Sequence, residues 1–329
     1  MTSSGHRVQA ADSPRDLDVV TRDRPTMYFI GVTTSQSSIM RLFPEWVTIL
    51  ELGDAELVGV DLPLHADPHQ YRRAVAQIKD DPLSLGALVT THKVDLLAAT
   101  RDLFDDLDRY AVLCNEVSNI AKREGRLVGF AKDPITAGRT LGEMLEPGYW
   151  GRTGGHVVCL GAGGTTAAIA AYLLTRSDRS NRPRRFVAVN RSPRGLQNLR
   201  SVVEQVDTHV DVEYVLNEDP RRNDALLEGL PPGSLVVNAT GMGKDRPGSP
   251  LTDRATFPQG GIAWELNYRG ELKFLHLARS QQAARDLLVH DGWRYFIHSW
   301  TEHIAEVFGL EITPGLFAML ADAAEGVRA

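Results

Sequence analysis

The sequence predicts an α/β protein of two domains. Short apolar runs alternate with amphipathic runs along most of the chain, which is typical of sheets whose faces are covered by helices. The length of 329 residues exceeds what one ordinary hydrophobic core holds together. The apolar run "HVVCLG" leads directly into a glycine-rich turn and an alanine-rich helical segment, so one domain is expected to be a Rossmann-like doubly wound sheet.

The first domain is expected over residues 27–136. Apolar strands are predicted at 27–32, 56–62, 86–91, 116–122 and 126–130, with amphipathic helices at 69–79 and 94–104. The last two strands meet across the turn "REG", whose length suits a hairpin. A helix at 134–145 and the loop "EPGYWGRTGG" then separate this domain from the next.

The second domain is expected over residues 137–290. Its strands are predicted at 156–161, 184–190, 210–216, 234–240 and 261–267, and helical stretches follow at 272–288, 293–309 and 314–326. Residues 291–329 are expected to complete the first domain. Residues 1–26 are polar, mixed in charge and without an apolar core, so we expect a flexible tail.

The composition favours a small-molecule partner. A net charge of -6 and a pI near 5.9 leave no excess of basic residues for binding nucleic acid or an anionic membrane. No apolar stretch approaches the roughly 20 residues of a membrane helix. We expect a monomer or a homodimer.

Cysteine and histidine usage indicates a cytoplasmic protein without a metal. There are only two cysteines, Cys114 and Cys159, and the second lies inside an apolar run, which is usual in a reducing compartment. His65 and His69 are separated by Pro68, and His298 and His303 lie off one helical face. No metal site is therefore expected.

The turn at residues 161–164 predicts dinucleotide binding. Gly161, Ala162, Gly163 and Gly164 follow a strand and open a helix, where glycines let the backbone approach a pyrophosphate and the helix N-terminus attracts it. The alternative is a tight turn that serves only packing, because the third glycine of the usual pattern is replaced by Thr166.

The following strand predicts which dinucleotide binds. It ends in Asn190 and Arg191, where an enzyme specific for NAD would offer a carboxylate to the ribose 2′-hydroxyl. An arginine presents a planar set of donors that suits a phosphate, so Arg191, assisted by Arg194, predicts NADP. The alternative is an exposed arginine at a strand end.

Several patches of the chain, in order, resemble the shikimate dehydrogenase family over roughly residues 28–309. The resemblance implies the following roles: substrate binding by Ser35 and Ser37 in "GVTTSQSS", by Thr90 in "GALVTTHK", by Asn119 in "EVSNI" and by Tyr268 in "ELNYRG"; catalysis by Lys93 and by Asp133 in "GFAKD"; and cofactor contacts in "GAGG", in "NRS" with Asn190 and Ser192, and in "VNATGMG" with Thr240 and Gly243.

The resemblance also implies a mechanism. In this family the lysine and the aspartate face each other in a cleft between the domains. When hydride from NADPH reaches a carbonyl carbon, an ammonium beside the oxygen stabilises the developing charge and supplies the proton. The alternative is that Lys93 opens the next helix and faces water.

The chain departs from the family at positions that are expected to recognise the substrate. Leu88 stands in place of an asparagine, and the stretch before Lys93 lacks a proline and is one residue shorter. Ala131 and Lys132 replace Asn-Thr before Asp133. Ser299 stands where the family offers a glutamine to a ring hydroxyl, so Ser299 is expected to be a sixth substrate-binding residue. Because such groups discriminate strongly between hydroxylated substrates, their loss predicts an altered substrate preference.

Together these features predict a shikimate dehydrogenase-like oxidoreductase with a divergent pocket. It would catalyse reversible hydride transfer between NADPH and a ketone of a small cyclic carboxylic acid, either 3-dehydroshikimate or an analogue from secondary metabolism. Two alternatives stay open: an imine reductase, and a non-catalytic module that senses NADP or a ligand.

Overall fold

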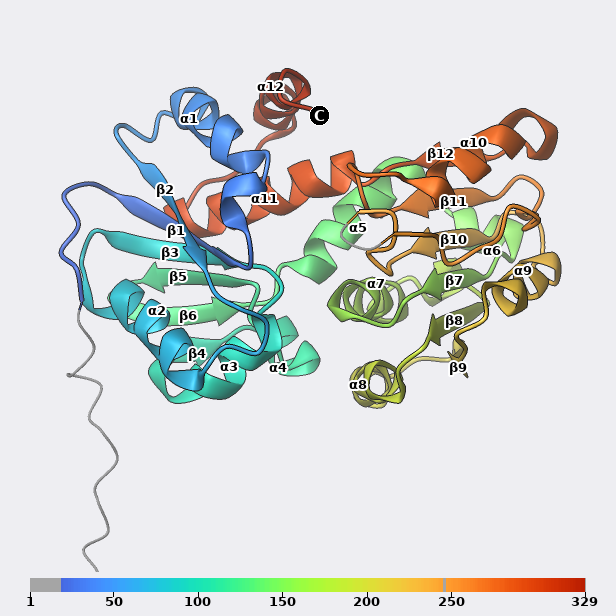
Figure 1. Cartoon of the computed structure of the whole chain (residues 1–329), viewed down its shortest axis with the longest axis horizontal. Coiled ribbons are helices and arrows are strands. Elements are labelled where there is room, and N and C mark those ends of the chain that lie inside the picture. Colours follow the sequence, from blue (N-terminus) through green and yellow to red (C-terminus); the bar gives the residue numbers. More distant parts are fainter. Residues whose placement is uncertain (1–18, 245–246, 329) are drawn as a thin grey trace, which may run out of the picture.

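The computed structural model describes residues 19–244 and 247–328, so most of the expected N-terminal tail lies outside the described residues. Two six-stranded sheets lie side by side, each covered by helices (Figure 1). The first contains strands from residues 26–130 and the second contains strands from residues 157–290. The predicted α/β class with two units is confirmed.

The first sheet is mixed. Its order is β2 (Glu56–Asp61), β1 (Thr26–Gly31), β3 (Ser84–Val89), β5 (Asn119–Arg123), β6 (Arg126–Phe130) and β4 (Asp106–Leu107). β1 is parallel to β2 and β3, whereas β5 is antiparallel to β3 and β6. The predicted hairpin joins β5 and β6, and Glu124 and Gly125 both have positive φ (51° and 78°), as a two-residue hairpin turn requires.

The second sheet is fully parallel. Its order is β12 (Leu288–His290), β11 (Ile262–Glu265), β10 (Leu235–Asn238), β7 (Val157–Leu160), β8 (Arg185–Asn190) and β9 (Asp211–Leu216). From β7 the chain adds β8 and β9 on one side of the sheet and then crosses to add β10, β11 and β12 on the other side. This is the Rossmann order. Ligands of such sheets bind where the order reverses, at the carboxyl ends of β7 and β10.

Helices cover both sheets. They are α1 (Ile39–Ile49), α2 (Pro68–Asp80), α3 (Lys93–Thr100), α4 (Arg109–Cys114), α5 (Asp133–Met144), α6 (Tyr149–Thr153), α7 (Gly164–Thr175), α8 (Pro193–Val203), α9 (Pro220–Glu228), α10 (Lys273–Arg285), α11 (Trp293–Phe308) and α12 (Pro314–Glu325), with short 3-10 turns η2 (Thr34–Gln36), η3 (Arg101–Leu103) and η4 (Arg179–Asn181). No helix of the described residues is long and apolar enough to span a bilayer.

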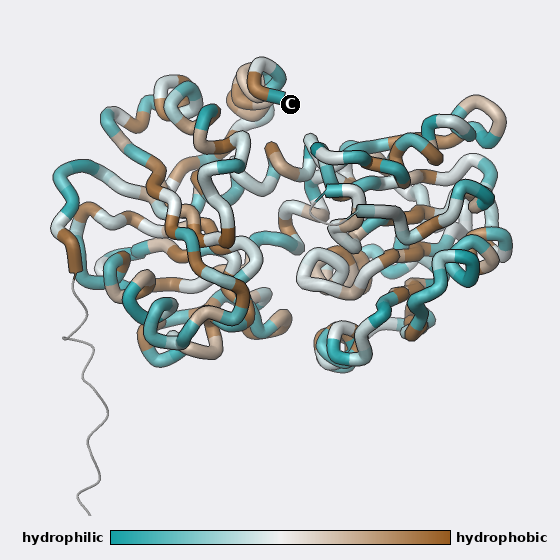
Figure 2. The backbone as a smooth tube through the Cα atoms, viewed as in Figure 1, coloured by the Kyte–Doolittle hydropathy of each residue, from teal (hydrophilic) through white to brown (hydrophobic). Residues whose placement is uncertain are grey.

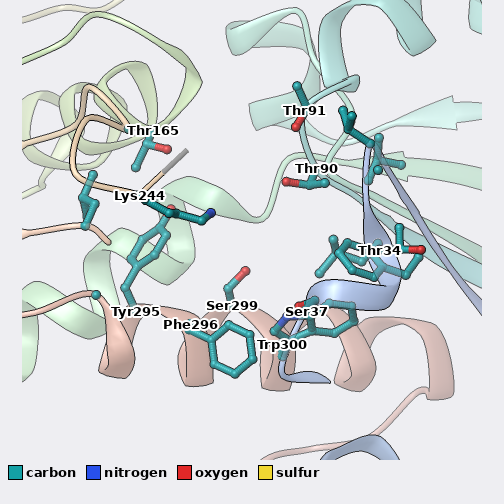
Figure 3. A pocket seen from close by; sticks show the side chains of 18 of the residues that line it. Thr34, Ser37, Thr90, Thr91, Thr165, Lys244, Tyr295, Phe296, Ser299 and Trp300 are labelled. Atoms are coloured by element: carbon teal, nitrogen blue, oxygen red, sulfur yellow. The ribbon is translucent and has the colours of Figure 1, made fainter. Parts of the chain in front are cut away.

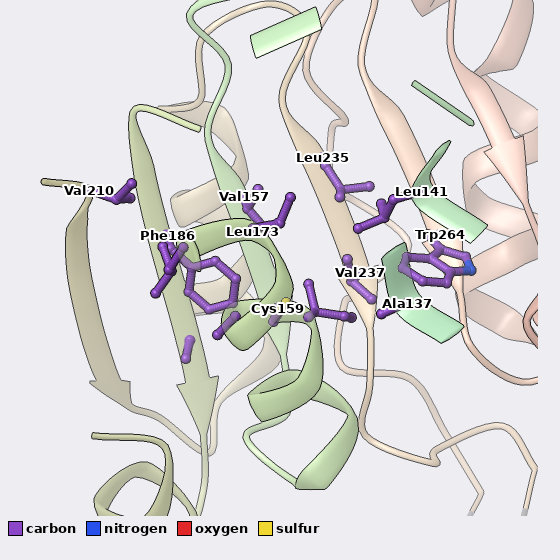
Figure 4. Packing of buried hydrophobic residues seen from close by; sticks show 14 of the residues in the cluster. Ala137, Leu141, Val157, Cys159, Leu173, Phe186, Val210, Leu235, Val237 and Trp264 are labelled. Atoms are coloured by element: carbon purple, nitrogen blue, oxygen red, sulfur yellow. The ribbon is translucent and has the colours of Figure 1, made fainter. Parts of the chain in front are cut away.

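The parallel strands of the second sheet are buried on both faces. Val157, Phe186, Leu235 and Trp264 pack against α7 and α5 on one face (Figure 4). Apolar residues of the two units gather along the strands and the inner helix faces, whereas the outer helix faces are largely hydrophilic (Figure 2). Because both faces of the sheet are buried, the sequences of these strands are continuously apolar rather than alternating between apolar and polar residues.

The C-terminal helices pack on the first sheet. Trp300 and Ile304 of α11 and Leu320 of α12 share one apolar cluster with Met27 and Leu88 of that sheet. α11 also contacts α5, which in turn packs closely against α7 of the second unit. The division of the chain into domains at residue 137 stays a prediction, but α5 and α11 run between the two sheets (Figure 1).

One expected helix is shorter than predicted. The stretch 272–288 was expected to be helical throughout, but α10 ends at Arg285 because Asp286 adopts a left-handed conformation (φ 50°). Leu288–His290 then form the edge strand β12, parallel to β11. The β-branched Val289 and the sheet edge thus override the helical pattern.

Candidate active site

A cavity of about 760 Å³ lies between the two sheets. Thr90 and Thr91 lie on one side and Thr165 and Lys244 on the other, with Ser299 on α11 below them (Figure 3). Its lining includes residues that follow the carboxyl ends of β1, β3, β10 and β11. Parallel strands bring these ends to one edge, which explains how segments distant in sequence share one site.

Lys93 and Asp133 form an ion pair in this cavity. Lys93 is the first residue of α3 and Asp133 is the first residue of α5, and their side chains are only 18% and 6% exposed. A carboxylate in the first turn of a helix is stabilised by the helix dipole, whereas an ammonium there is not. The aspartate therefore offsets the unfavourable position of the lysine at the start of a helix. Although the stretch before Lys93 is one residue shorter than in the family, the Lys93 side chain still lines the cavity.

A second carboxylate, Glu116, influences this pair. Burial works against the Lys93 ammonium, but the charges of Asp133 and Glu116 outweigh it and raise the pKa of Lys93. Burial raises the pKa of Glu116 to about 7, with Lys93 opposing the shift and Asp133 adding to it. The lysine is therefore held as an ammonium, which is the form able to donate a proton.

Four of the six residues expected to bind substrate line the cavity: Ser37, Thr90, Tyr268 and Ser299. Ser35 is exposed and does not line it, because the turn η2 directs Thr34 inward instead. The backbone N–H and hydroxyl of Thr34 both donate to Asp61 Oδ1, at 2.7 and 2.6 Å. This carboxylate fixes the turn that presents Ser37.

Asn119 is likewise not among the lining residues. It lies at the start of β5, fully buried, and its side-chain amide donates to the backbone carbonyl of His303 at 3.2 Å. The expected contact between Asn119 and substrate stays a prediction. The amide joins the first sheet to α11 instead.

One face of α11 forms the floor of the cavity. Tyr295, Ser299 and His303 follow one another at intervals of four residues and all line it. His303 Nδ1 donates to the carbonyl of Ser299 at 2.5 Å, because a carbonyl can only accept. Burial lowers the pKa of His303 to about 4, so the ring is neutral at pH 7.

Apolar groups line the rest of the substrate side. Leu88 belongs to β3, and Phe29, Phe296 and Trp300 also line the cavity. The rings of Phe29 and Trp300 meet edge to face, with centroids 4.9 Å apart. Such a wall favours a ligand with at least one apolar face, and Leu88 offers no hydrogen bond where the family has an amide.

The glycine turn has the shape that a dinucleotide needs. Gly161 has φ 109°, and a Cβ there would lie 2.5 Å from the carbonyl oxygen of Ala239. At Gly163 a Cβ would meet nothing within 4 Å, so the backbone is open to a ligand at the N-terminus of α7. These residues fit a pyrophosphate. Gly161–Gly164 follow β7 at the point where the strand order reverses, and their contact with a cofactor stays a prediction.

The expected 2′-phosphate clamp follows β8. Arg191 and Arg194 are exposed beside the N-terminus of α8. Asn190 donates from Nδ2 to the carbonyl of Ser192 at 3.1 Å and so shapes this turn. Both arginines are free to reach a phosphate at the carboxyl end of the neighbouring strand.

A buried network fixes the loop after β10. Asn238 Oδ1 accepts from the hydroxyl of Thr240 at 2.7 Å, and its Nδ2 donates to Glu265 at 2.6 Å. Burial raises the pKa of Glu265 to about 7. Thr240 lines the cavity, while Gly243 lies further along the loop with φ 89°.

The sequence pointed to neither Glu116 nor the pair Tyr295 and His303. The spacing of four on α11 would have found Tyr295 and His303 from Ser299. Glu116 carried a weaker signal, an acid next to a run of buried positions. Among the described residues no cluster of three or more His, Cys, Asp or Glu side chains could hold a metal ion.

The fold and cavity define a class of α/β proteins in which a Rossmann sheet faces a second α/β unit across a cleft. No family model matches the chain. A curated relative, the NADP(+) shikimate dehydrogenase of Symbiobacterium thermophilum, is 29% identical over 239 residues, covering 70% of this chain and 76% of the relative. This similarity confirms the resemblance to the shikimate dehydrogenase family that the motifs indicated.

Solved structures support the fold. Quinate dehydrogenase from Corynebacterium glutamicum in complex with NAD superposes with a TM-score of 0.70 at 19% identity, covering 93% of this chain and all (100%) of that one. The 5-ketofructose reductase of Gluconobacter sp. gives a TM-score of 0.64 at 18% identity, covering 92% and 99%. The same architecture therefore occurs in proteins whose names give different substrates.

Proposed function

We propose that the chain is an NADPH-dependent oxidoreductase that reduces, reversibly, a carbonyl group of a small cyclic carboxylic acid. The observation that carries the proposal is the buried pair of Lys93 and Asp133, which lines a cavity shared with the end of the glycine-bearing sheet. Its relative from Symbiobacterium thermophilum is named an NADP(+) shikimate dehydrogenase. A module that only binds a ligand has no need for such a pair.

Lys93 is the proton donor in this proposal. Its raised pKa keeps it an ammonium, and Asp133 accepts one of its N–H groups and so orients the others toward the cavity. NADPH, when bound, supplies the hydride. The ammonium then stabilises the charge on the carbonyl oxygen and transfers a proton to it.

The glycine turn and Arg191 would hold the cofactor. The open backbone at Gly163 and the N-terminus of α7 suit the pyrophosphate. Arg191, with Arg194 nearby, suits the 2′-phosphate, because a guanidinium matches phosphate geometry and stays charged.

Ser37 and Tyr268 would bind the acid group, with Thr90 and Ser299 toward the rest of the ring. The apolar wall of Leu88, Phe29 and Trp300 argues against a ring hydroxylated on every side. We therefore expect an analogue of 3-dehydroshikimate that lacks a hydroxyl, or carries another group, on the side of Leu88.

The test is NADPH oxidation with purified protein and a panel of cyclic keto acids, including 3-dehydroshikimate, deoxy analogues and one imine. We expect turnover of a deoxy analogue to exceed that of 3-dehydroshikimate. Lys93→Met should abolish most of it. Lys122→Met is the matched control, because Lys122 bonds the carbonyl of Asp81 and does not line the cavity.

Two results would contradict the proposal. Efficient turnover of 3-dehydroshikimate, at the ~10⁴ M⁻¹s⁻¹ or better that is usual for a native substrate, would refute the altered specificity alone. Tight NADPH binding with no oxidation of any member of the panel would favour a sensing module over an enzyme.

A further inference from the structure

Glu116 is a buried carboxylate for which the proposed reaction has no role. It lies in the connection between α4 and β5 and is only 3% exposed. Its Oε1 atom has no hydrogen-bond partner among the described residues. A buried carboxylate oxygen without a partner is costly, so a missing partner is worth seeking.

The carboxylate lies against the glycine turn. Its Oε2 atom is 2.9 Å from the position that a Cβ of Gly164 would occupy, and Gly164 is the first residue of α7. The preceding helix α4 packs on α7 across the boundary between the two units. Glu116 therefore belongs to the first unit in sequence but borders the candidate cofactor site of the second.

Charged and titratable groups face Glu116 from every neighbouring element. They are Lys93 of α3, whose carbonyl accepts the N–H of Val117, Asp133 of α5, Cys114 of α4 and Tyr295 of α11. Lys93 is the cation of this group and Asp133 already neutralises it. A charged Glu116 therefore leaves this buried cluster with a net negative charge.

We propose that Glu116 is a proton-linked part of the cofactor site: its carboxylate takes up one proton when NADP(H) binds on the turn at Gly161–Gly164. The inference rests on the proposed function, because it assumes that a dinucleotide binds there. Phosphate groups at the N-terminus of α7 repel a carboxylate beside Gly164, and protonation removes the repulsion. The proton comes from solvent, an O–H bond forms on the carboxyl group, and no redox step is involved.

The sign of the pH dependence follows from linkage. In the free protein the pKa of Glu116 is about 7, so the group is mostly protonated below that value and binding needs no proton. Above it, each bound cofactor must draw one proton from solution. Affinity should be nearly constant below pH 7 and should fall with rising pH, by up to tenfold per unit.

The experiment measures the Kd of NADPH between pH 7 and 9, a range that avoids the second ionisation of a phosphate monoester near pH 6. Proton uptake is measured in parallel by calorimetry in buffers of different ionisation heat. We expect the wild-type protein to take up about half a proton at pH 7 and close to one at pH 9, where the loss of affinity approaches tenfold per pH unit. Glu116→Gln should show no loss and no uptake, with the tight affinity of the protonated form.

Two further variants keep the test decisive. Glu116→Ala, which removes the carboxyl group altogether, should behave like Glu116→Gln if the glutamine variant folds poorly. Glu302→Gln is the matched control, because Glu302 is also a buried carboxylate with a raised pKa but pairs with Arg139. It should keep the wild-type pH dependence.

The outcomes separate this inference from the proposed function. Equal pH dependence in the wild type and both Glu116 variants, with NADPH still bound, would overturn the inference alone. Absence of NADPH binding at every pH in every variant would overturn both. Proton uptake that disappears only in the Glu116 variants would support the assignment.

Discussion

The two sides of the cavity are built by different means. On the cofactor side, one short turn of consecutive residues, Gly161–Gly164, presents backbone at the end of a parallel sheet. On the substrate side, single side chains arrive from separate segments: Ser37 after β1, Thr90 after β3, Tyr268 after β11 and Ser299 on α11. The cofactor side is therefore a local structure of consecutive residues, whereas the substrate side is assembled from side chains that lie far apart in the sequence.

This difference has a physical consequence for how each side responds to change. A backbone turn depends on conformational freedom, so its sensitive positions are those where a Cβ has no room. An assembly of side chains depends on charge and hydrogen bonding, so single groups can be exchanged while the fold is kept. Evolution of a new substrate preference is therefore expected on the assembled side.

The largest effect should come from the assembled side. Lys93→Met should reduce the single-turnover rate by about 10² or more, because it removes both the proton and the charge that stabilises the oxyanion. NADPH affinity should change little. Asp133→Asn should also slow the reaction, and the double variant should lose much less than the sum of the two effects, since the residues act as one unit. Simple additivity would mean two independent charges.

The next effect tests the end of β8. Arg191→Ala should weaken NADPH binding by about 1.5 to 3 kcal/mol, the usual range for a hydrogen bond to a charged group. NADH binding should stay the same, and equilibrium titration with both dinucleotides measures the difference. Equal affinity of the unmodified protein for NADPH and NADH would show that Arg191 does not bind the 2′-phosphate.

On the cofactor side, two alanine substitutions in the glycine turn distinguish an effect on stability from an effect on NADPH binding. Gly161→Ala should destabilise the protein by about 1 to 3 kcal/mol, because the residue has φ 109° and its Cβ would contact Ala239. Gly163→Ala should leave the melting temperature almost unchanged, since space is open there, but should weaken NADPH binding. If Gly163→Ala binds NADPH normally, the open space is not where the pyrophosphate lies.

The smallest effect sharpens the role of one residue on the substrate side. Asn119→Ala should cost about 1 kcal/mol of unfolding free energy, as expected for a lost hydrogen bond to the His303 carbonyl. The KM for substrate should change little. A large rise in KM with unchanged stability would instead show that Asn119 binds substrate.

The sequence by itself determined most of the architecture. Strand, turn and helix around Gly161–Gly164 are neighbours in the chain, so their periodicity and glycines predict the local structure directly. The hairpin at Glu124 and Gly125 was predictable for the same reason. Family motifs placed Lys93 and Asp133 in one site, and the structure pairs them.

Only the tertiary structure decided which side chains meet. Asn119 and Ser35 lie in matching motifs, yet one bonds to α11 and the other faces solvent, because orientation depends on neighbours distant in sequence. Glu116 opens the family motif "EVSNI", but the resemblance implied no role for it. Its importance arises because α4 docks on α7, which places a first-unit carboxylate beside the glycine turn of the second unit. Local pattern cannot encode such a contact, because the charge, burial and partner that define it come from separate parts of the chain.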